Sequence, residues 1–130
     1  MGLVPFLIRN KEVFRIVIPA IAYAERRYFY LLNGDLPDSY DKDLSSFNAE
    51  ILPLTREQVN IAIDLAYAHR HELPFREHNR DYLIAGQCIQ LVDILITYNK
   101  KHFEPLDLVP TRILTPEEFL NEFTPMDDDV

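Results

Sequence analysis

The sequence contains a single cysteine, Cys88, among its 130 residues. One thiol excludes an internal disulfide and fits a protein of the reducing cytosol. Long apolar runs are also missing, because no stretch reaches the roughly 18 residues that a membrane-spanning helix needs. The apolar residues 1–8 carry neither the basic region nor the small-residue cleavage site of a signal peptide. These absences predict a cytoplasmic protein with no membrane partner.

Positive charge is in short supply as well. Lys and Arg number 13 and Asp and Glu number 21, so the formal net charge is −8. Phosphate contacts depend on Lys and Arg, and the deficit therefore argues against broad, nonspecific coating of DNA. It still allows a local basic strip that holds one nucleic-acid strand, and an acidic metal site would itself add negative charge.

Internal repeats, low-complexity tracts and linkers are absent too. The length and the 48% hydrophobic content fit one domain with one core. We assign this single domain to residues 1–124. Residues 125–130 include three consecutive aspartates and are predicted to form an acidic flexible tail.

The sequence does contain short apolar runs that alternate with amphipathic segments. The runs suit buried strands, and the segments with a 3.6-residue apolar period suit helices. This alternation predicts βαβ units and therefore an α/β fold with a mainly parallel sheet. The expected strands are 15–18, 51–54, 93–97 and 112–114. The expected helices are 20–32, 55–71 and 81–89, with one more that ends within 6–15 and one that starts at Thr115. Residues 74–79 are expected to form a polar loop, and residues 35–46 a loop or the start of a short helix.

Two of the expected helices carry explicit start signals. Thr55 is followed three residues later by Gln58, which is the pattern of a capping box. Thr115 precedes Pro116 and two glutamates, so a capping residue, a proline at the first helical position and first-turn acids coincide.

Candidate ligands for a hard divalent cation stand near the ends of predicted strands, where α/β folds place their sites. Glu25 lies one turn into the helix after strand 15–18, Asp81 begins a later helix, and Asn99 follows strand 93–97. Mg²⁺ and Mn²⁺ favour such oxygen ligands and can activate water at a phosphate. The alternative is that the acids serve as helix caps or as partners of the helix dipole.

Four segments, taken in order, resemble the PIN-domain family. Residues 18–25 are similar to the family's passage from a strand into a helix that carries a glutamate, and residues 81–86 to its aspartate with an Ile-Ala-Ala-like helix start. Residues 93–103 and 109–120 resemble its strand-and-turn motif and its closing strand and helix. The VapC toxins of toxin–antitoxin pairs are the branch that this similarity favours.

The resemblance implies a PIN-like three-layer sandwich with a mainly parallel sheet and endoribonuclease chemistry that uses Mg²⁺ or Mn²⁺. RNA would be the substrate, an antitoxin protein the partner, and a homodimer the assembly. Glu25 and Asp81 would be the metal-site acids, and Asn99 would join them as a catalytic residue.

Two departures from the family pattern bear on activity. The family's first strand carries an Asp-Thr-Asn-like motif that has no counterpart before strand 15–18, so we expect the first strand to be missing. Asn99 stands where the third acid would be and offers a carbonyl oxygen without charge. Fewer carboxylates imply weaker metal binding and a slow enzyme. The alternative is a catalytically degraded PIN-like module that acts by binding or dimerisation.

Residues around the proposed site could contact the substrate. Thr97 could position water or phosphate, and Arg26 and Lys100 could hold the phosphate backbone, although solvated surface charge explains the two cations equally well. The histidines are interpreted as surface or loop residues, with His102 nearest the site. Cys88 is expected in the core.

A run of aromatic residues marks the helix predicted over 20–32. Part of this segment must be core, and the rest could form an antitoxin or dimer interface, because exposed aromatics are enriched at interfaces. The aromatic residues are Tyr23, Tyr28, Phe29 and Tyr30.

Overall fold

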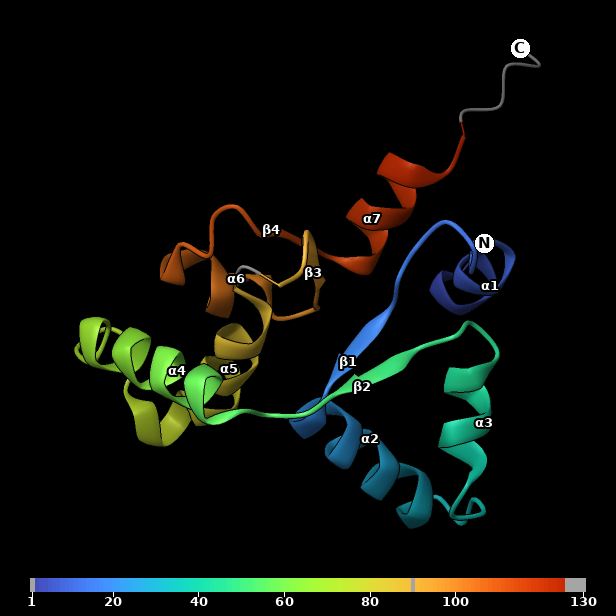
Figure 1. Cartoon of the computed structure of the whole chain (residues 1–130), viewed down its shortest axis with the longest axis horizontal. Coiled ribbons are helices and arrows are strands. Elements are labelled where there is room, and N and C mark those ends of the chain that lie inside the picture. Colours follow the sequence, from blue (N-terminus) through green and yellow to red (C-terminus); the bar gives the residue numbers. More distant parts are fainter. Residues whose placement is uncertain (1, 90, 126–130) are drawn as a thin grey trace.

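The computed structural model describes residues 2–89 and 91–125, which form helices packed around short strands (Figure 1). The first elements are α1 (Leu3–Arg9), β1 (Val17–Pro19), α2 (Ala20–Leu32), α3 (Ser39–Ser45), β2 (Glu50–Leu52) and α4 (Arg56–Ala68). They are followed by α5 (Phe75–Cys88), β3 (Ile94–Ile96), α6 (Lys100–Phe103), the 3-10 helix η1 (Glu104–Leu106), β4 (Arg112–Leu114) and α7 (Pro116–Phe123). The α/β class is confirmed. The predicted tail, apart from Pro125, lies outside the described residues.

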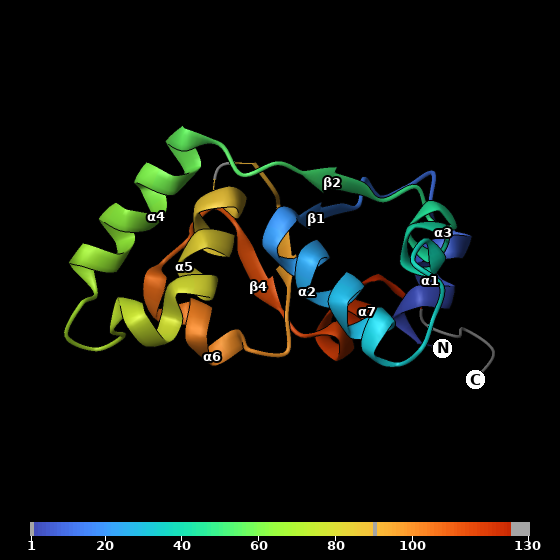
Figure 2. The same ribbon diagram turned by 90° about the horizontal axis from the view of Figure 1, so that it is seen from below.

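The strands pair in parallel, as predicted, but the described residues form two separate two-stranded sheets. Val17 of β1 is in register with Glu50 of β2, and Ile94 of β3 is in register with Arg112 of β4. Figure 1 shows the β1–β2 pair apart from the β3–β4 pair, and Figure 2 shows β1, β2 and β4 from below. The expectation of one mainly parallel sheet is therefore replaced by two parallel pairs.

Two clusters of buried apolar side chains support these pairs. One cluster is built mainly on α4, α5, α6 and η1, and it includes Cys88, whose exposed fraction of 3% confirms the predicted core position. The other brings α1, α3 and α7 together. Its buried members are Phe6, Leu7, Tyr40, Leu44, Phe47, Leu114 and Phe119.

Both predicted helix starts are confirmed by reciprocal hydrogen bonds. At the start of α4, Thr55 Oγ1 accepts from the Gln58 amide at 3.2 Å and Gln58 Oε1 accepts from the Thr55 amide at 2.9 Å. Thr115 and Glu118 exchange the same bonds at the start of α7. These bonds satisfy amides that have no partner inside the helix.

Polar segments account for the differences from the predicted elements. The predicted loop 74–79 is wrong, because α5 begins at Phe75 and continues through a kink at His78, where φ is −123° and ψ is 19°. The residues before Asp81 are too polar to show an apolar period, so the pattern does not reveal this helical turn. Residues 39–45 form a helix, which is the second alternative for 35–46, and α1 ends at Arg9, within the predicted range 6–15.

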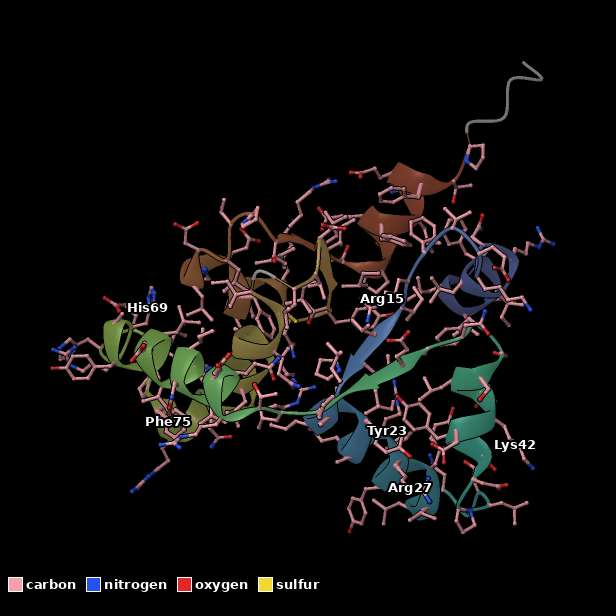
Figure 3. The ribbon with its side chains drawn as sticks, viewed as in Figure 1. Arg15, Tyr23, Arg27, Lys42, His69 and Phe75 are labelled. Atoms are coloured by element: carbon pink, nitrogen blue, oxygen red, sulfur yellow. The ribbon has the colours of Figure 1, made fainter. Side chains whose placement is uncertain are left out.

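Helix α2 is attached to α3 by polar contacts. The Tyr23 hydroxyl donates to Asp41 Oδ1 at 2.5 Å, and Arg27 donates to Asp41 Oδ2 at 3.0 Å (Figure 3). Tyr28 and Phe29 are exposed, as predicted for part of the aromatic segment. The expected core part is not reached, because Tyr23 and Tyr30 are only partly buried against the second cluster and α2, which is described throughout, has no buried residue. Although α2 is rich in apolar residues, neither it nor any other helix among the described residues is long and apolar enough to cross a bilayer.

Helix α5 is fixed on two sides, and this matters because it carries Asp81. At Gly86 it approaches α4 so closely that an added Cβ would overlap the backbone oxygen of Gln58 and lie 2.9 Å from the Ala62 methyl. The fully buried Gln87 donates to the backbone oxygens of residues 52–53, at 3.0 and 3.1 Å. Together these contacts hold α5 against α4 and the end of β2.

Burial gives Cys88 a testable chemical property. Desolvation raises the pKa of the thiol to about 12, so little thiolate exists at mildly alkaline pH. We expect iodoacetamide to alkylate the folded protein at least about 100-fold more slowly than the protein in concentrated guanidinium chloride, where the ordinary pKa returns. Mass spectrometry of timed samples measures both rates. Equal rates in the two solutions would contradict the buried position.

Candidate metal-binding site around Asp81

Asp81 is the most enclosed carboxylate of the candidate site. It lies in α5 one turn after the kink at His78, on the side of the helix that faces the core, and it is 8% exposed. An ionised carboxylate removed from water needs partners, because desolvation otherwise costs several kcal/mol. Both oxygens of Asp81 have such partners, and the partners differ in kind.

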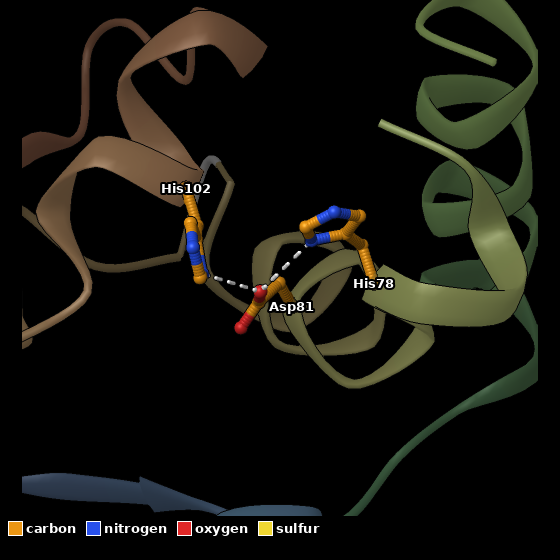
Figure 4. A group of neighbouring side chains, drawn as sticks. All are labelled: His78, Asp81 and His102. Atoms are coloured by element: carbon orange, nitrogen blue, oxygen red, sulfur yellow. Dashed lines mark hydrogen bonds and ion pairs between the residues drawn. The ribbon is translucent and has the colours of Figure 1, made fainter. Parts of the chain in front are cut away.

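Two histidines share the oxygen Oδ2 of Asp81 (Figure 4). His102 from α6 places its Nδ1 3.2 Å from this oxygen, and His78 places its Nδ1 3.7 Å from it. The two imidazole rings meet edge to face, with their centroids 5.3 Å apart. Because His78 stands at the kink of α5 and His102 follows β3, the cluster joins segments that are distant in the sequence.

The other oxygen of Asp81 faces a guanidinium group. Arg80 Nη1 lies 3.4 Å from Asp81 Oδ1, and Arg80 Nε forms a close ion pair with Glu25 Oε1. Glu25 belongs to α2, so the guanidinium stands between the two acids that sequence analysis assigns to the metal. Arg80 and Glu25 are both about half exposed, which limits the strength of their ion pair.

The donor set can be tested against the cations that the resemblance implies. Nitrogen and oxygen atoms of His78, Asp81 and His102 lie within 4.8 Å of one another, so small movements would let them share an ion. Two imidazoles and a carboxylate suit Mn²⁺ and later transition metals better than Mg²⁺, which prefers oxygen ligands alone. A cation between Glu25 and Asp81 would instead have to displace Arg80. The histidine side of Asp81 is therefore the better fit.

Asn99 and Thr97 lie in the turn between β3 and α6. The backbone amide of Asn99 donates to Thr97 Oγ1 at 3.0 Å, which shapes this turn. Within the described residues, the Asn99 side chain has no hydrogen bond to Glu25 or Asp81, and it is exposed. The structure thus brings His102 to Asp81, while the catalytic role of Asn99 stays a prediction.

The two predicted phosphate-binding cations have different surroundings. Lys100 Nζ lies 3.0 Å from both carboxylate oxygens of Glu118 on α7, so it already balances an acid. The Arg26 guanidinium lies 5.5 Å from the centroid of the Phe29 ring and is exposed. Their binding of substrate stays a prediction.

Sequence reasoning missed two residues of this cluster, His78 and Arg80. His78 and Asp81 have the i, i+3 spacing that places side chains on one face of a helix, and this signal was available once the helix was known to start at Phe75. Arg80 stands next to Asp81 in the sequence, but its pairing with Glu25 spans 55 positions and follows only from the packing of α2 against α5.

Comparisons with protein-family models, with curated proteins and with solved structures found no match for this chain.

Proposed function

We propose that this chain is a metal-dependent endoribonuclease of the PIN type with low activity, and the VapC-like toxin of a cytoplasmic toxin–antitoxin pair. The observation that carries the proposal is that Glu25 and Asp81, which come from different helices, both pair with Arg80. Sequence resemblance had selected these two acids independently. We also propose that the two parallel strand pairs and their helices are parts of a PIN-like three-layer sandwich.

The residues around Asp81 fit the chemistry that phosphodiester cleavage needs. A bound Mn²⁺ or Mg²⁺ would supply a Lewis acid that lowers the pKa of water and offsets the charge of a phosphate. Asp81, His78 and His102 would hold the cation, and Glu25 would add a further oxygen donor. The imidazoles make Mn²⁺ the favoured ion of the two.

Substrate binding would use the guanidinium of Arg80. It is half exposed, and a planar guanidinium can donate two hydrogen bonds to one phosphate. A phosphate would take the place of the carboxylates that Arg80 contacts here, which frees Glu25 and Asp81 for the cation. Arg26 and Lys100 would extend the contact along the RNA backbone.

Cleavage of single-stranded RNA with Mn²⁺ tests this function. We expect slow cleavage that stops when the metal is chelated. We expect Glu25→Gln to slow it at least about 10-fold, because a metal-site contact is typically worth 10- to 100-fold. Asp64→Asn is the matched control, since Asp64 is an exposed acid of α4 that is not among the residues of the cluster, and it should cleave like the wild type.

Two outcomes would count against this assignment. Cleavage that persists unchanged in Glu25→Gln would remove Glu25 from the site. If the wild type cleaves none of several RNA sequences in the presence of metal, the proposed nuclease function is contradicted.

A binding or dimerisation module is the second candidate function. A specific observation favours it: Arg80 already neutralises both acids, which removes some of their attraction for a cation. Apolar side chains of α2 also remain exposed, among them Phe29 and Leu32. This function predicts no cleavage with any metal and an association of copies, or of the chain with an antitoxin, through α2.

A further inference from the structure

Each strand of the two small sheets has one unpaired edge, and the unpaired edges of β1 and β3 border the same groove. The groove has a volume of about 1460 Å³ and is mostly apolar. Its lining includes all of residues 13–19 with β1 and all of residues 91–97 with β3, but only Leu52 from β2 and none of β4. Among the described residues no strand pairing joins β1 to β3. The groove therefore separates the free edge of β1 from the free edge of β3.

The hydrogen bonds of β1 identify which backbone groups face the groove. The Glu50 amide donates to the Ile16 oxygen at 2.9 Å, so Ile16 points toward β2. Successive residues of a strand direct their backbone groups to opposite sides. The amide and carbonyl of Val17 therefore point away from β2, toward the groove.

The same reasoning applies to β3. The Thr97 amide donates to the Leu114 oxygen at 2.9 Å, and the Arg112 amide donates to the Asp93 oxygen at 2.8 Å. Asp93 and Thr97 thus face β4, and the residues between them alternate. Ile94 and Ile96 direct their amides and carbonyls toward the groove.

The burial of both strands fits an incomplete sheet. Strands of parallel sheets are normally buried on both faces. Here every residue of β1 and of β3 keeps an intermediate exposure. Helix α2, which follows β1 directly, has no buried residue within the described structure although most of its residues are apolar.

We propose that the groove receives an extended apolar segment of another polypeptide, which pairs with β1 on one side and β3 on the other and makes one five-stranded sheet. Only a strand satisfies the backbone groups of both edges, because a helix uses its own amides and carbonyls internally. The groove also exceeds the 300–1,000 Å³ that is usual for small-molecule sites. This inference does not depend on the proposed nuclease activity.

The chemistry of the occupant follows from the lining. Most of the side chains that line the groove are apolar, among them Val13, Phe29, Leu91 and Leu95, although Arg15, Arg26, Asp43, Arg80 and Asp93 also line it. The sequence of a strand that is buried on both faces is a nearly continuous run of Val, Ile or Leu, in which apolar and polar residues do not alternate. The matching segment therefore has about five consecutive β-branched or aliphatic residues, which span the length of the short strands beside it.

The probe for this site is a synthetic peptide with five alternating valines and isoleucines between flanking lysines. Amide hydrogen exchange of the full chain, followed by NMR, is measured with and without the peptide. We expect the amides of Val17, Ile94 and Ile96 to exchange at least about 10-fold more slowly with the peptide. Those of Ile18 and Leu95, which face the existing partner strands, should change much less.

Two control peptides test for pairing on both sides. Each carries N-methyl groups on one of the two alternating sets of amides, and both should bind at least about 10-fold more weakly, because a central strand uses both sets. Loss of binding with only one of them would mean pairing with a single edge and would contradict insertion. Failure of the unmodified peptide to protect the three amides would overturn the proposal.

A second copy of the chain could occupy the groove instead. Hydrogen exchange without the peptide, together with sedimentation, distinguishes this case. If Val17, Ile94 and Ile96 are protected without peptide and sedimentation shows a dimer, the groove is filled by a second copy, which overturns the proposal. A monomer whose three amides become protected only with the peptide supports it.

Discussion

The Asp81→Asn variant is expected to bind Mn²⁺ more than about 100-fold more weakly than the wild type, a loss at the upper end of what metal-site contacts contribute. Asp81 is the carboxylate that both imidazoles approach, and it supplies the negative charge of the cluster. Asparagine keeps the shape but offers one neutral carbonyl oxygen. Titration of Mn²⁺, followed by the electron paramagnetic resonance signal of the free ion, measures the affinity.

Matched variants locate the cation around Asp81. If the histidine side holds the ion, His102→Gln should weaken Mn²⁺ binding at least about 10-fold and Glu25→Gln should weaken it less. The reverse order would place the ion between Glu25 and Asp81, with Arg80 displaced. Asp64→Asn should bind like the wild type. Wild-type affinity in Asp81→Asn would contradict a metal site at this residue.

The Gly86→Val variant is expected to lose about 3 kcal/mol or more of its free energy of unfolding, the upper range for an overpacked core. The first added carbon already overlaps the backbone oxygen of Gln58, and backbone cannot rotate away as a side chain can. The two helices would have to separate, which opens contacts around Ala62. Since small domains are stable by only about 5–15 kcal/mol, this is a large fraction of the total.

Urea unfolding followed by circular dichroism measures this loss, and Gly34 provides the control. Gly34 has a φ of +82°, but an added Cβ would meet nothing within 4 Å. Gly34→Ala should therefore cost only the conformational term of about 1 kcal/mol, and Gly34→Asn less still. An equal effect of Gly86→Val and Gly34→Ala would show that the close approach of α5 to α4 does not limit stability.

Local signals were enough to predict most of the elements. The capping residues Thr55 and Thr115 start their helices as expected, because the bonds that fix them span only three residues. The strand positions are also correct to within one or two residues. The failure at 74–79 has a local cause too, since a polar helical turn before the kink at His78 has no apolar period to detect.

Long-range arrangement could not be predicted in the same way. Parallel strands can be recognised one at a time, but which edges join depends on contacts across the whole chain, and the division into two pairs has no sequence signal. The candidate site shows the same limit. Asp81 and Glu25 could be selected as acids by resemblance, whereas Arg80 between them depends on how α2 meets α5.

Arg80 also lines the groove between β1 and β3, so one residue borders the groove and pairs with Glu25 and Asp81. A strand in the groove that moves the Arg80 side chain would change the charge beside Glu25 and Asp81, and a cation that moves it would change the charge beside the groove. Thermodynamic linkage then requires reciprocity: the factor by which a strand in the groove alters the affinity for a cation equals the factor by which the cation alters the affinity for the strand. If both proposed ligands bind, Arg80 would couple them, and the coupling free energy could be measured from either side.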